Sequence, residues 1–101
     1  MREVRQLSIE ELLSSKTRLK ILKVLLELKE VNITKLTRLT ELNHKVVQYH
    51  LEILKRYGLI EEKQIGRIRI VKLREKDPKV EKICMLFREL EQLIKEDSCV
   101  E

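Results

Sequence analysis

The stretch NHKVVQYHLEILKRYGLI, residues 43–60, decides the fold that we expect for this chain. Asn43 is a favourable N-cap and helices often stop at a glycine such as Gly58, so the stretch predicts a helix over about 44–57. On a helical wheel its apolar residues fall on one side: Val47, Leu51 and Leu54. The opposite side carries long hydrogen-bonding side chains: Lys45, Gln48, Tyr49, Glu52 and Arg56. Such a helix can pack on a core by one side and enter the major groove of DNA by the other.

Two helices are expected at the start of the chain. Ser8 followed by Glu11 resembles a capping box, so a short helix should begin there. Ser14 or Ser15 can cap the next helix, over about 16–29. Most sides of that second helix are apolar, which predicts a place at the centre of the domain.

Further elements are expected on both sides of the 44–57 helix. The β-branched residues of 30–33 favour a brief strand, and apolar residues at every third position predict a helix over about 34–41. After the central helix, residues 59–64 and 68–73 have the apolar pattern of two strands joined by a turn at 65–67. A short helix, a turn, a longer helix and a β-hairpin make up a helix-turn-helix with a wing.

The end of the chain predicts one more helix, because Asp77-Pro78 combines an N-cap with proline at the first helical position. That helix should cover about 78–96. The fold class we expect is therefore mainly α with a small β-hairpin (α+β), a winged helix-turn-helix with an added C-terminal dimerisation helix. The two parts are a winged helix-turn-helix DNA-binding domain over residues 1–76, with its recognition helix at about 44–57 and its wing at about 59–74, and a C-terminal dimerisation helix over 77–101.

Length and composition narrow the class of protein. The chain has 101 residues, room for one core, and 39% of them are charged, with two glycines and one proline, a composition typical of thermophiles. No stretch has the length of a membrane span, and the acids near the N-terminus argue against a signal or transit peptide. We therefore expect a cytoplasmic protein that does not associate with membranes. Two cysteines are too few for a secreted disulfide scaffold.

Positive charge is concentrated in the middle of the chain. Residues 33–74 hold ten lysines and arginines against four glutamates, a local net charge of +6, whereas residues 75–101 carry a net charge of −3. A basic middle segment is expected if it faces a polyanion, although a basic surface that meets only solvent would have the same composition.

Three segments resemble ArsR-type winged-helix regulators of the archaeal type. Residues 14–22, SSKTRLKIL, resemble the opening helix, where that family has Thr-Arg-Leu-x-Ile-Leu. Residues 36–43, LTRLTELN, resemble the first motif helix and its turn, with Glu41 where the family commonly has glycine. Residues 45–60 resemble the recognition helix that runs into the wing. The resemblance covers about residues 14–74 and implies a winged-helix DNA-binding protein that controls transcription. The Cys-x-Cys motif of metal-sensing members is absent from 44–57, so metal sensing is not implied.

The resemblance also assigns candidate DNA contacts. Base-reading residues would be His44, Lys45, Gln48 and Tyr49; Gln48 can pair bidentately with adenine, and Lys45 can donate to guanine. Thr34 and Lys35, at the start of the first motif helix, are placed to hold a phosphate. The remaining expected contacts are to the DNA backbone: Lys55, Arg56, Lys63, Arg67 and Arg69. Arg67, at the tip of the wing, can reach the minor groove or the backbone. Ordinary solvation is the alternative for each cation of the wing.

The last helix has the apolar spacing of a coiled-coil seam. Its members are expected at the dimer interface: Val80, Ile83, Cys84, Phe87, Leu90 and Ile94. Leu86 and Leu93 form a second apolar line, so one line can pack on the chain itself while the other meets a second copy. A disulfide across the dimer through Cys84 or Cys99 is an alternative to two unpaired thiols.

The sequence shows no catalytic or metal-binding pattern. No cluster of His, Cys, Asp or Glu has a spacing suited to zinc, and there is no nucleophile with a base or phosphate-binding glycine loop, so neither an enzyme nor a cofactor is expected. His50 lies beside the buried side of its helix, which favours hydrogen-bonded packing over a role as a ligand. We expect sequence-specific binding of double-stranded DNA by a homodimeric transcriptional regulator, a repressor rather than an activator. The alternatives are a nonspecific architectural DNA-binding protein and a winged-helix module for protein–protein interaction.

Overall fold

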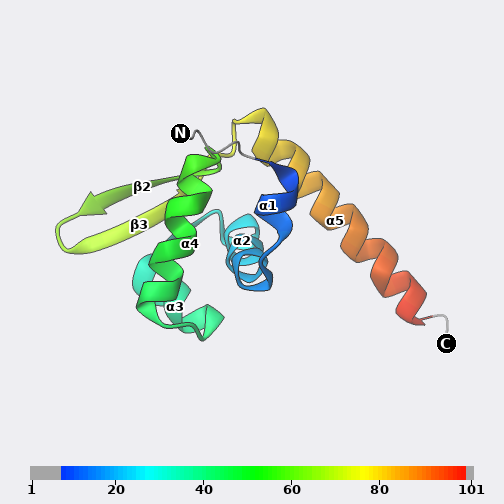
Figure 1. The fold of residues 1–101 in the computed structure, drawn as a ribbon, viewed down its shortest axis with the longest axis horizontal. Coiled ribbons are helices and arrows are strands. Elements are labelled where there is room, and N and C mark those ends of the chain that lie inside the picture. Colours follow the sequence, from blue (N-terminus) through cyan, green and yellow to red (C-terminus); the bar gives the residue numbers. More distant parts are fainter. Residues whose placement is uncertain (1–7, 100–101) are drawn as a thin grey trace, which may run out of the picture.

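The structure is a computed structural model that describes residues 8–99, with side chains described for 8–97. It consists of five helices and one small sheet within these residues (Figure 1). In chain order the elements are α1 (Ile9–Leu13), α2 (Lys16–Leu28), β1 (Glu30–Asn32), α3 (Ile33–Thr40), α4 (His44–Arg56), β2 (Ile60–Ile65), β3 (Ile68–Leu73) and α5 (Pro78–Cys99). This order confirms the winged helix-turn-helix with a long C-terminal helix that the sequence predicts.

Side-chain caps set where the helices begin. Ser8 accepts a hydrogen bond from the N–H of Glu11 at the start of α1, as the capping-box spacing predicts. Of the two serines that could cap α2, Ser15 is the one that does so. Asn43 caps α4 by accepting from the N–H of Val46 at 2.9 Å, which confirms the expected start of that helix. The cap of α3 is Asn32, one of the residues expected in a strand, so α3 begins earlier than expected.

The turn between α3 and α4 depends on a left-handed residue. Glu41 has φ 60° and ψ 33°, and its N–H donates to the carbonyl of Thr37 at 3.0 Å. A left-handed backbone costs a residue with a Cβ about 1 kcal/mol or more, whereas glycine adopts it freely. This is the position at which the sequence has glutamate where glycine was expected from the resemblance, and the turn forms nonetheless.

The sheet has three antiparallel strands in the order β1-β3-β2. The expected fold class counted only the two strands of the hairpin, and the brief strand expected near residues 30–33 joins them as β1. Val31 of β1 pairs with Val71 of β3, which joins the segment before α3 to the base of the hairpin. In the hairpin itself, β2 runs one residue further than expected, and Ile65 pairs with Ile68. Gly66, at φ 61°, permits the tight turn between them. We call the hairpin, residues 60–73, the wing.

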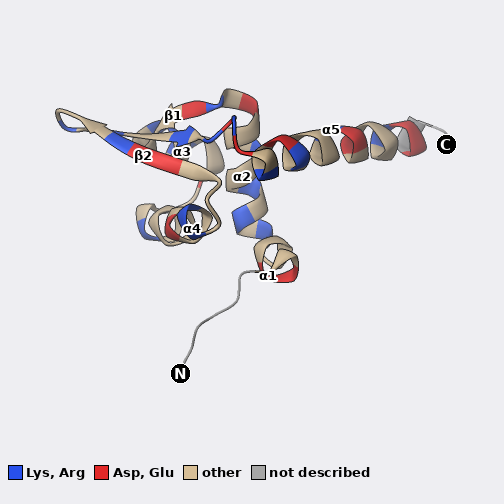
Figure 2. Cartoon of the chain, turned by 90° about the horizontal axis from the view of Figure 1, so that it is seen from above, with Lys and Arg blue, Asp and Glu red and all other residues tan. Residues whose placement is uncertain are grey.

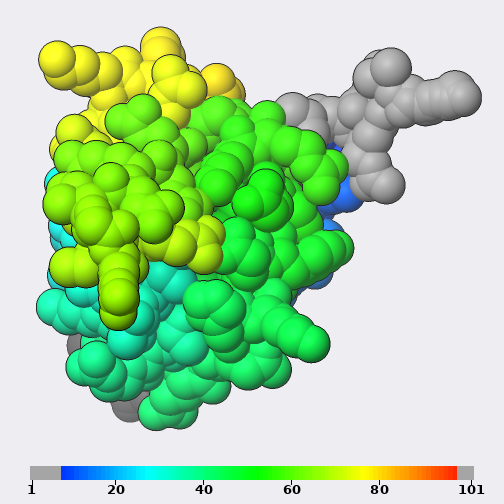
Figure 3. Space-filling view, turned by 90° about the vertical axis from the view of Figure 1, so that its left-hand side faces the viewer, coloured from blue at the N-terminus to red at the C-terminus, as the bar shows by residue number. Residues whose placement is uncertain are grey.

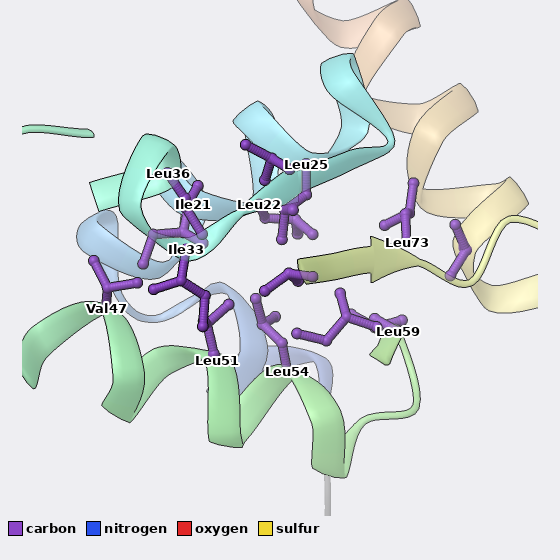
Figure 4. Close-up of a cluster of buried hydrophobic side chains, with 14 of the residues drawn as sticks. Ile21, Leu22, Leu25, Ile33, Leu36, Val47, Leu51, Leu54, Leu59 and Leu73 are labelled. Carbon is purple, nitrogen blue, oxygen red and sulfur yellow. The ribbon is translucent and has the colours of Figure 1, made fainter. Parts of the chain in front are cut away.

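The core lies between α2, α3, α4 and the base of the wing (Figure 4). Its side chains are almost all aliphatic, and Val47, Leu51 and Leu54 of α4 are completely buried in it. Each such side chain contributes about 1.5–3 kcal/mol through removal of apolar surface from water. The apolar side of α4 is thus buried in the domain, and its opposite side is exposed.

Helix α5 is only partly packed on the domain. Val80 is buried in the core, and Ile83 and Phe87 pack against it from the first half of the helix. The second half runs away from the rest of the molecule (Figure 1). Lys23 of α2 and Glu91 form an ion pair along its course. No helix among residues 8–99 is long and apolar enough to cross a membrane.

Candidate nucleic-acid interface

Helices α3 and α4 and the wing share one face of the molecule (Figure 3). In this view the wing projects toward the viewer, with α4 beside it and α3 below. Basic residues mark α3 and the outer part of the wing (Figure 2). A helix and a hairpin presented on one face is the geometry in which winged-helix proteins meet a duplex.

The exposed side of α4 carries the predicted base-reading residues, which we call the reading face: His44, Lys45, Gln48 and Tyr49. His44 and Lys45 are exposed in the first turn, and Tyr49 is 60% exposed. Gln48 is half-buried, and its amide nitrogen donates to Glu52 Oε2 at 3.2 Å. Three of the four side chains are therefore free to meet a base edge, and Gln48 has to leave Glu52 before it can pair with adenine.

A hollow of about 550 Å³ separates the wing from the two helices. Its polar lining comes from all three parts of the interface: Asn32, Thr34, Arg38, His44, Arg67 and Arg69. Thr34 and Arg67 both line this hollow, whereas Lys35, which was expected to hold a phosphate together with Thr34, is exposed but does not line it. Convergent arginines beside the start of a helix are suited to a phosphate group.

Arg38 is a candidate contact that the sequence reasoning missed. It lies four residues after Thr34 in α3, so both residues are on the same side of that helix. This spacing is present in the sequence, but it indicates that Arg38 shares a site with Thr34 only when Thr34 is known to line the hollow. The exposed Arg38 adds a cation from the helix-turn-helix to the two arginines that the wing supplies to the hollow.

Two of the predicted backbone contacts, Lys55 and Arg69, also form ion pairs within the chain. Lys55 Nζ lies 2.7 Å from Glu62 Oε1, and Arg69 Nε donates to Glu62 Oε2 at 2.5 Å. Glu62 is only 14% exposed. The hydrogen bond from Arg69, aided by Lys55, lowers the pKa of Glu62, and the hydrogen bond to Glu62 raises the pKa of Lys55. The carboxylate therefore stays charged and joins α4 to both strands of the wing.

The remaining cations are spread along the molecule. Arg67 and Lys63 are exposed in the turn and outer part of the wing. Arg56, at the end of α4, lines a different groove, which it shares with Lys79 and Lys82 of α5. The structure thus gathers Thr34, Arg67 and Arg69 near the reading face and places Arg56 apart from them.

Buried polar groups lie behind the reading face. His50 is 7% exposed, which confirms its predicted packing role, but its Nδ1 has no hydrogen-bond partner in the described part of the chain. Burial, together with the positive charge of Arg18, lowers the pKa of His50. The expected hydrogen bond is therefore not seen at Nδ1, and the ring is held by packing.

Within residues 8–97, no group of three His, Cys, Asp or Glu side chains could hold a metal ion.

Comparison with known proteins identifies the family. The sequence profile of the family described as "Bacterial regulatory protein, arsR family" matches residues 15–62, from the cap of α2 into β2. Over residues 15–62, just under half of the chain, the sequence is that of an ArsR-family regulator. As an ArsR-family protein it is a DNA-binding transcription regulator and not an enzyme. Among curated proteins, none is similar enough in sequence to count as a relative.

Solved structures have the same fold. Reduced HlyU from Vibrio cholerae N16961 is 25% identical, with 79% of this chain and 81% of that chain covered and a TM-score of 0.67. The homodimeric winged helix-turn-helix domain of Mb0332 from Mycobacterium bovis is 22% identical, covers 86% and 78%, and has a TM-score of 0.69. The AntR antimony-specific transcriptional repressor is 20% identical, covers 85% and 76%, and has a TM-score of 0.71. The archaeal and thermophilic origin of this ArsR-family chain stays a prediction.

Proposed function

We propose that the protein binds double-stranded DNA sequence-specifically as a homodimer and represses transcription. Helix α4 enters the major groove with the reading face, and the wing lies on the adjacent backbone or minor groove. The observation that carries this proposal is that His44, Lys45 and Tyr49 are exposed on one helix, whose first residue, His44, lines a hollow together with three arginines. The arginines supply phosphate contacts that fix register, and the reading face supplies groups that discriminate bases.

The reading face favours a specific regulator over an architectural protein. An architectural protein needs cations and a bendable duplex, and it makes no base-specific contact. Here a histidine, a lysine, a glutamine and a tyrosine present different donors and acceptors from two turns of one helix. Such chemical variety is what discrimination between base pairs requires.

The homodimer is supported by an apolar surface on α1 and α5. Its residues are 38–62% exposed in the single chain: Ile9, Leu13, Met85, Leu86, Leu90, Leu93 and Ile94. Of the predicted seam, Leu90 and Ile94 belong to this surface, whereas Val80 is buried in the chain's own core. The M. bovis domain described as homodimeric has the same fold. Two copies would place two α4 helices to read a pseudo-palindrome.

A disulfide across this dimer stays a prediction. Cys84 is a free, half-buried thiol, and it lines a hollow with Lys23 and Leu26 of α2. This places Cys84 on the side of α5 that packs on its own chain. The side chain of Cys99 lies outside the described residues. A non-reducing gel after mild oxidation tests the bond, and a band at monomer mass alone would exclude it.

Fluorescence anisotropy tests the proposed DNA binding. The wild-type protein is titrated onto a duplex selected from a random library by the protein itself, and onto scrambled DNA, across a salt series. The variant Lys45→Ala/Gln48→Ala is compared with Lys20→Ala/Gln92→Ala, which makes the same substitutions on other helices. We expect a preference of ~10³-fold or more for the selected duplex, lost only in the first variant.

Two other outcomes would overturn the proposal. Equal, salt-steep binding to every duplex would indicate an architectural protein. No binding at low salt would indicate a protein–protein module that uses α5. Repression is tested separately by transcription in vitro from a promoter that contains the selected site, where added protein should lower transcript yield. We place this activity in the cytoplasm, because the chromosome of a prokaryotic cell lies there.

A further inference from the structure

A groove lies where α1, the end of α4 and the start of α5 meet (Figure 1). Its volume of about 730 Å³ is in the range of ordinary small-molecule sites, and we call it the α4–α5 groove. The aliphatic wall of this groove is supplied by α1, by α5 and by the segment after α4: Ile9, Leu12, Leu59 and Ile83. The DNA binding proposed above gives no role to this wall.

The wall is in place before any ligand binds. Leu12 is 3% exposed and Leu59 is 1% exposed, so the core holds both of them. The hydroxyl of Tyr57 donates to the carbonyl of Ser8 at 2.9 Å, and both residues line the groove. This hydrogen bond joins the end of α4 to the start of α1. A preformed apolar wall with few polar groups is typical of sites for small molecules.

Three cations line the same groove: Arg56 at the end of α4, and Lys79 and Lys82 near the start of α5. Lys79 Nζ lies 3.2 Å from Asp77 Oδ2. Arg56 and Lys82 are exposed and have no ion-pair partner within residues 8–97. No acidic side chain from the described part of the chain lines the groove. Unpaired cations beside an aliphatic wall fit an anion with an apolar body.

We propose that the α4–α5 groove binds a small aliphatic carboxylate, whose head group pairs with Arg56 and Lys82 and whose hydrocarbon chain packs on the aliphatic wall. A guanidinium holds a carboxylate by two parallel hydrogen bonds, and the lysine adds a second charge. The protein's own first seven residues do not match the groove in charge, because they hold two arginines and one glutamate.

The ligand should also weaken DNA binding, and this part of the inference rests on the function proposed above. Arg56 is one of the predicted contacts to the DNA backbone. A carboxylate on Arg56 removes a cation from the end of the helix that carries the reading face, so DNA and ligand compete for the same charge. By linkage, bound DNA lowers the affinity for the ligand by the same factor.

NMR titration of the full chain tests the site without DNA. Hexanoate, octanoate and decanoate are added below their micelle concentrations, and the amide shifts of the ¹⁵N-labelled protein report where each one binds. Octanol and octylamine keep the chain of octanoate and replace its negative charge by none or by a positive one. We expect shifts centred on Tyr57, Gly58 and Ile83. Each buried methylene is worth about fourfold in affinity, so two more should tighten binding about tenfold.

A pair of variants tests the head-group contact. Arg56→Gln/Lys82→Gln should bind octanoate about tenfold more weakly, because it loses both charged partners. Arg88→Gln/Lys20→Gln removes the same charges from exposed positions outside the groove and should bind octanoate like wild type. The series of chain lengths uses wild type alone, so it tests the site even if the first variant fails to fold.

Fluorescence anisotropy tests the effect on DNA. Saturating decanoate should weaken wild-type binding of the selected duplex by about tenfold, within the usual range of coupling between two sites. It should have no effect on Arg56→Gln/Lys82→Gln. If decanoate binds in the groove and leaves DNA affinity unchanged, the site stands and the coupling is wrong. If wild type binds no duplex, the proposed function fails, and the NMR titration still decides the site.

Three results would overturn the site itself. Octanol or octylamine binding as tightly as octanoate would show that the cations do not hold the head group, and so would unchanged binding by Arg56→Gln/Lys82→Gln. Shifts centred on Leu86, Leu90 and Leu93 would place the chain on the apolar surface of α5 instead. An absence of shifts at millimolar decanoate would show that the groove takes no aliphatic carboxylate.

Discussion

Lys55 Nζ at the end of α4 lies 2.7 Å from Glu62 Oε1 in β2, so an ion pair connects the helix that carries the reading face to the wing. Arg69 of β3 closes the group from the other strand by donating to Glu62 Oε2. Glu52 extends it toward the reading face, because it accepts from Lys55 and from Gln48. A single carboxylate thus links the two parts of the molecule that would meet DNA, in addition to the apolar contacts at the base of the wing.

Glu62→Gln should raise the nonspecific affinity for DNA and lower the preference for the selected duplex over the scrambled duplex. The change removes one negative charge near the DNA surface, so nonspecific affinity should rise. It also leaves Lys55 and Arg69 without their shared carboxylate, so the wing is less firmly held and discrimination between selected and scrambled duplex should fall. We expect a stability loss of about 1 kcal/mol, since both cations are near one-third exposed.

The matched control for that variant is Glu61→Gln, the exposed neighbour with the same change of charge. Anisotropy on the two duplexes gives the ratio of the dissociation constants, and denaturant unfolding gives the stability. Glu61→Gln should raise affinity for both duplexes and leave their ratio unchanged. Equal ratios in the two variants would show that Glu62 acts only through its charge.

The ion group also shows where sequence reasoning reaches its limit. The contacts of Lys55 and Arg69 with the DNA backbone stay a prediction, but their shared acid was not foreseen, because a sequence shows a cation and not the acid that faces it from another element. Glu62 is seven residues from each of them along the chain, and only the fold brings all three together. The caps of α1 and α4, by contrast, depend on residues three positions apart and were predicted correctly.

Two other differences have the same origin. β1 is three residues long, and its pairing with β3 spans about forty residues, so the local pattern indicated a strand but not its partner. The apolar seam of α5 has the same spacing whether it meets its own domain or a second copy. The position of α5 on the core decides that Val80 packs inside and Leu90 stays exposed.

Acid should destabilise the protein through His50. Its pKa is below the usual 6.5 in the folded chain, because the ring is buried beside Arg18. Between that lowered pKa and 6.5 the unfolded chain binds more protons, so stability is fully present above pH 6.5 and is lost as the pH falls toward the folded pKa. Thermal melts at pH 7.5, 6.0 and 5.0 should show the loss, and His50→Gln should show less of it. An equal loss in both proteins would assign the effect to other groups.

Glu41→Gly should stabilise the protein despite the greater flexibility of glycine. The left-handed backbone at φ 60° costs a residue with a Cβ about 1–2 kcal/mol, and glycine in the unfolded chain costs about 0.4–1 kcal/mol. The net gain of up to about 1.6 kcal/mol corresponds to a rise of several degrees in Tm. Glu75→Gly, also exposed but outside the left-handed region, should lower Tm slightly, and a parallel fall in Glu41→Gly would contradict the argument.

Leu90→Glu should break the proposed homodimer without unfolding the chain. Leu90 is 47% exposed in the single chain, so the substitution leaves the core intact and puts a charge into the apolar surface of α5. Sedimentation should give a monomer, and affinity for a two-half-site duplex should fall by two orders of magnitude or more, about the contribution of linking two binding events. Gln92→Glu adds the same charge to an exposed position of α5, and it should remain dimeric.

Val80→Ala distinguishes the two halves of the predicted seam. Val80 is 3% exposed within its own chain, so its truncation should lower the free energy of unfolding by about 1–3 kcal/mol and leave the sedimentation of the folded protein unchanged. The opposite outcome would be that the Leu90→Glu variant remains a dimer while the Val80→Ala variant is folded but monomeric. That result would mean that α5 swings away from its own core to meet a second copy along the seam 80–94, because only then would Val80 be exposed to a partner.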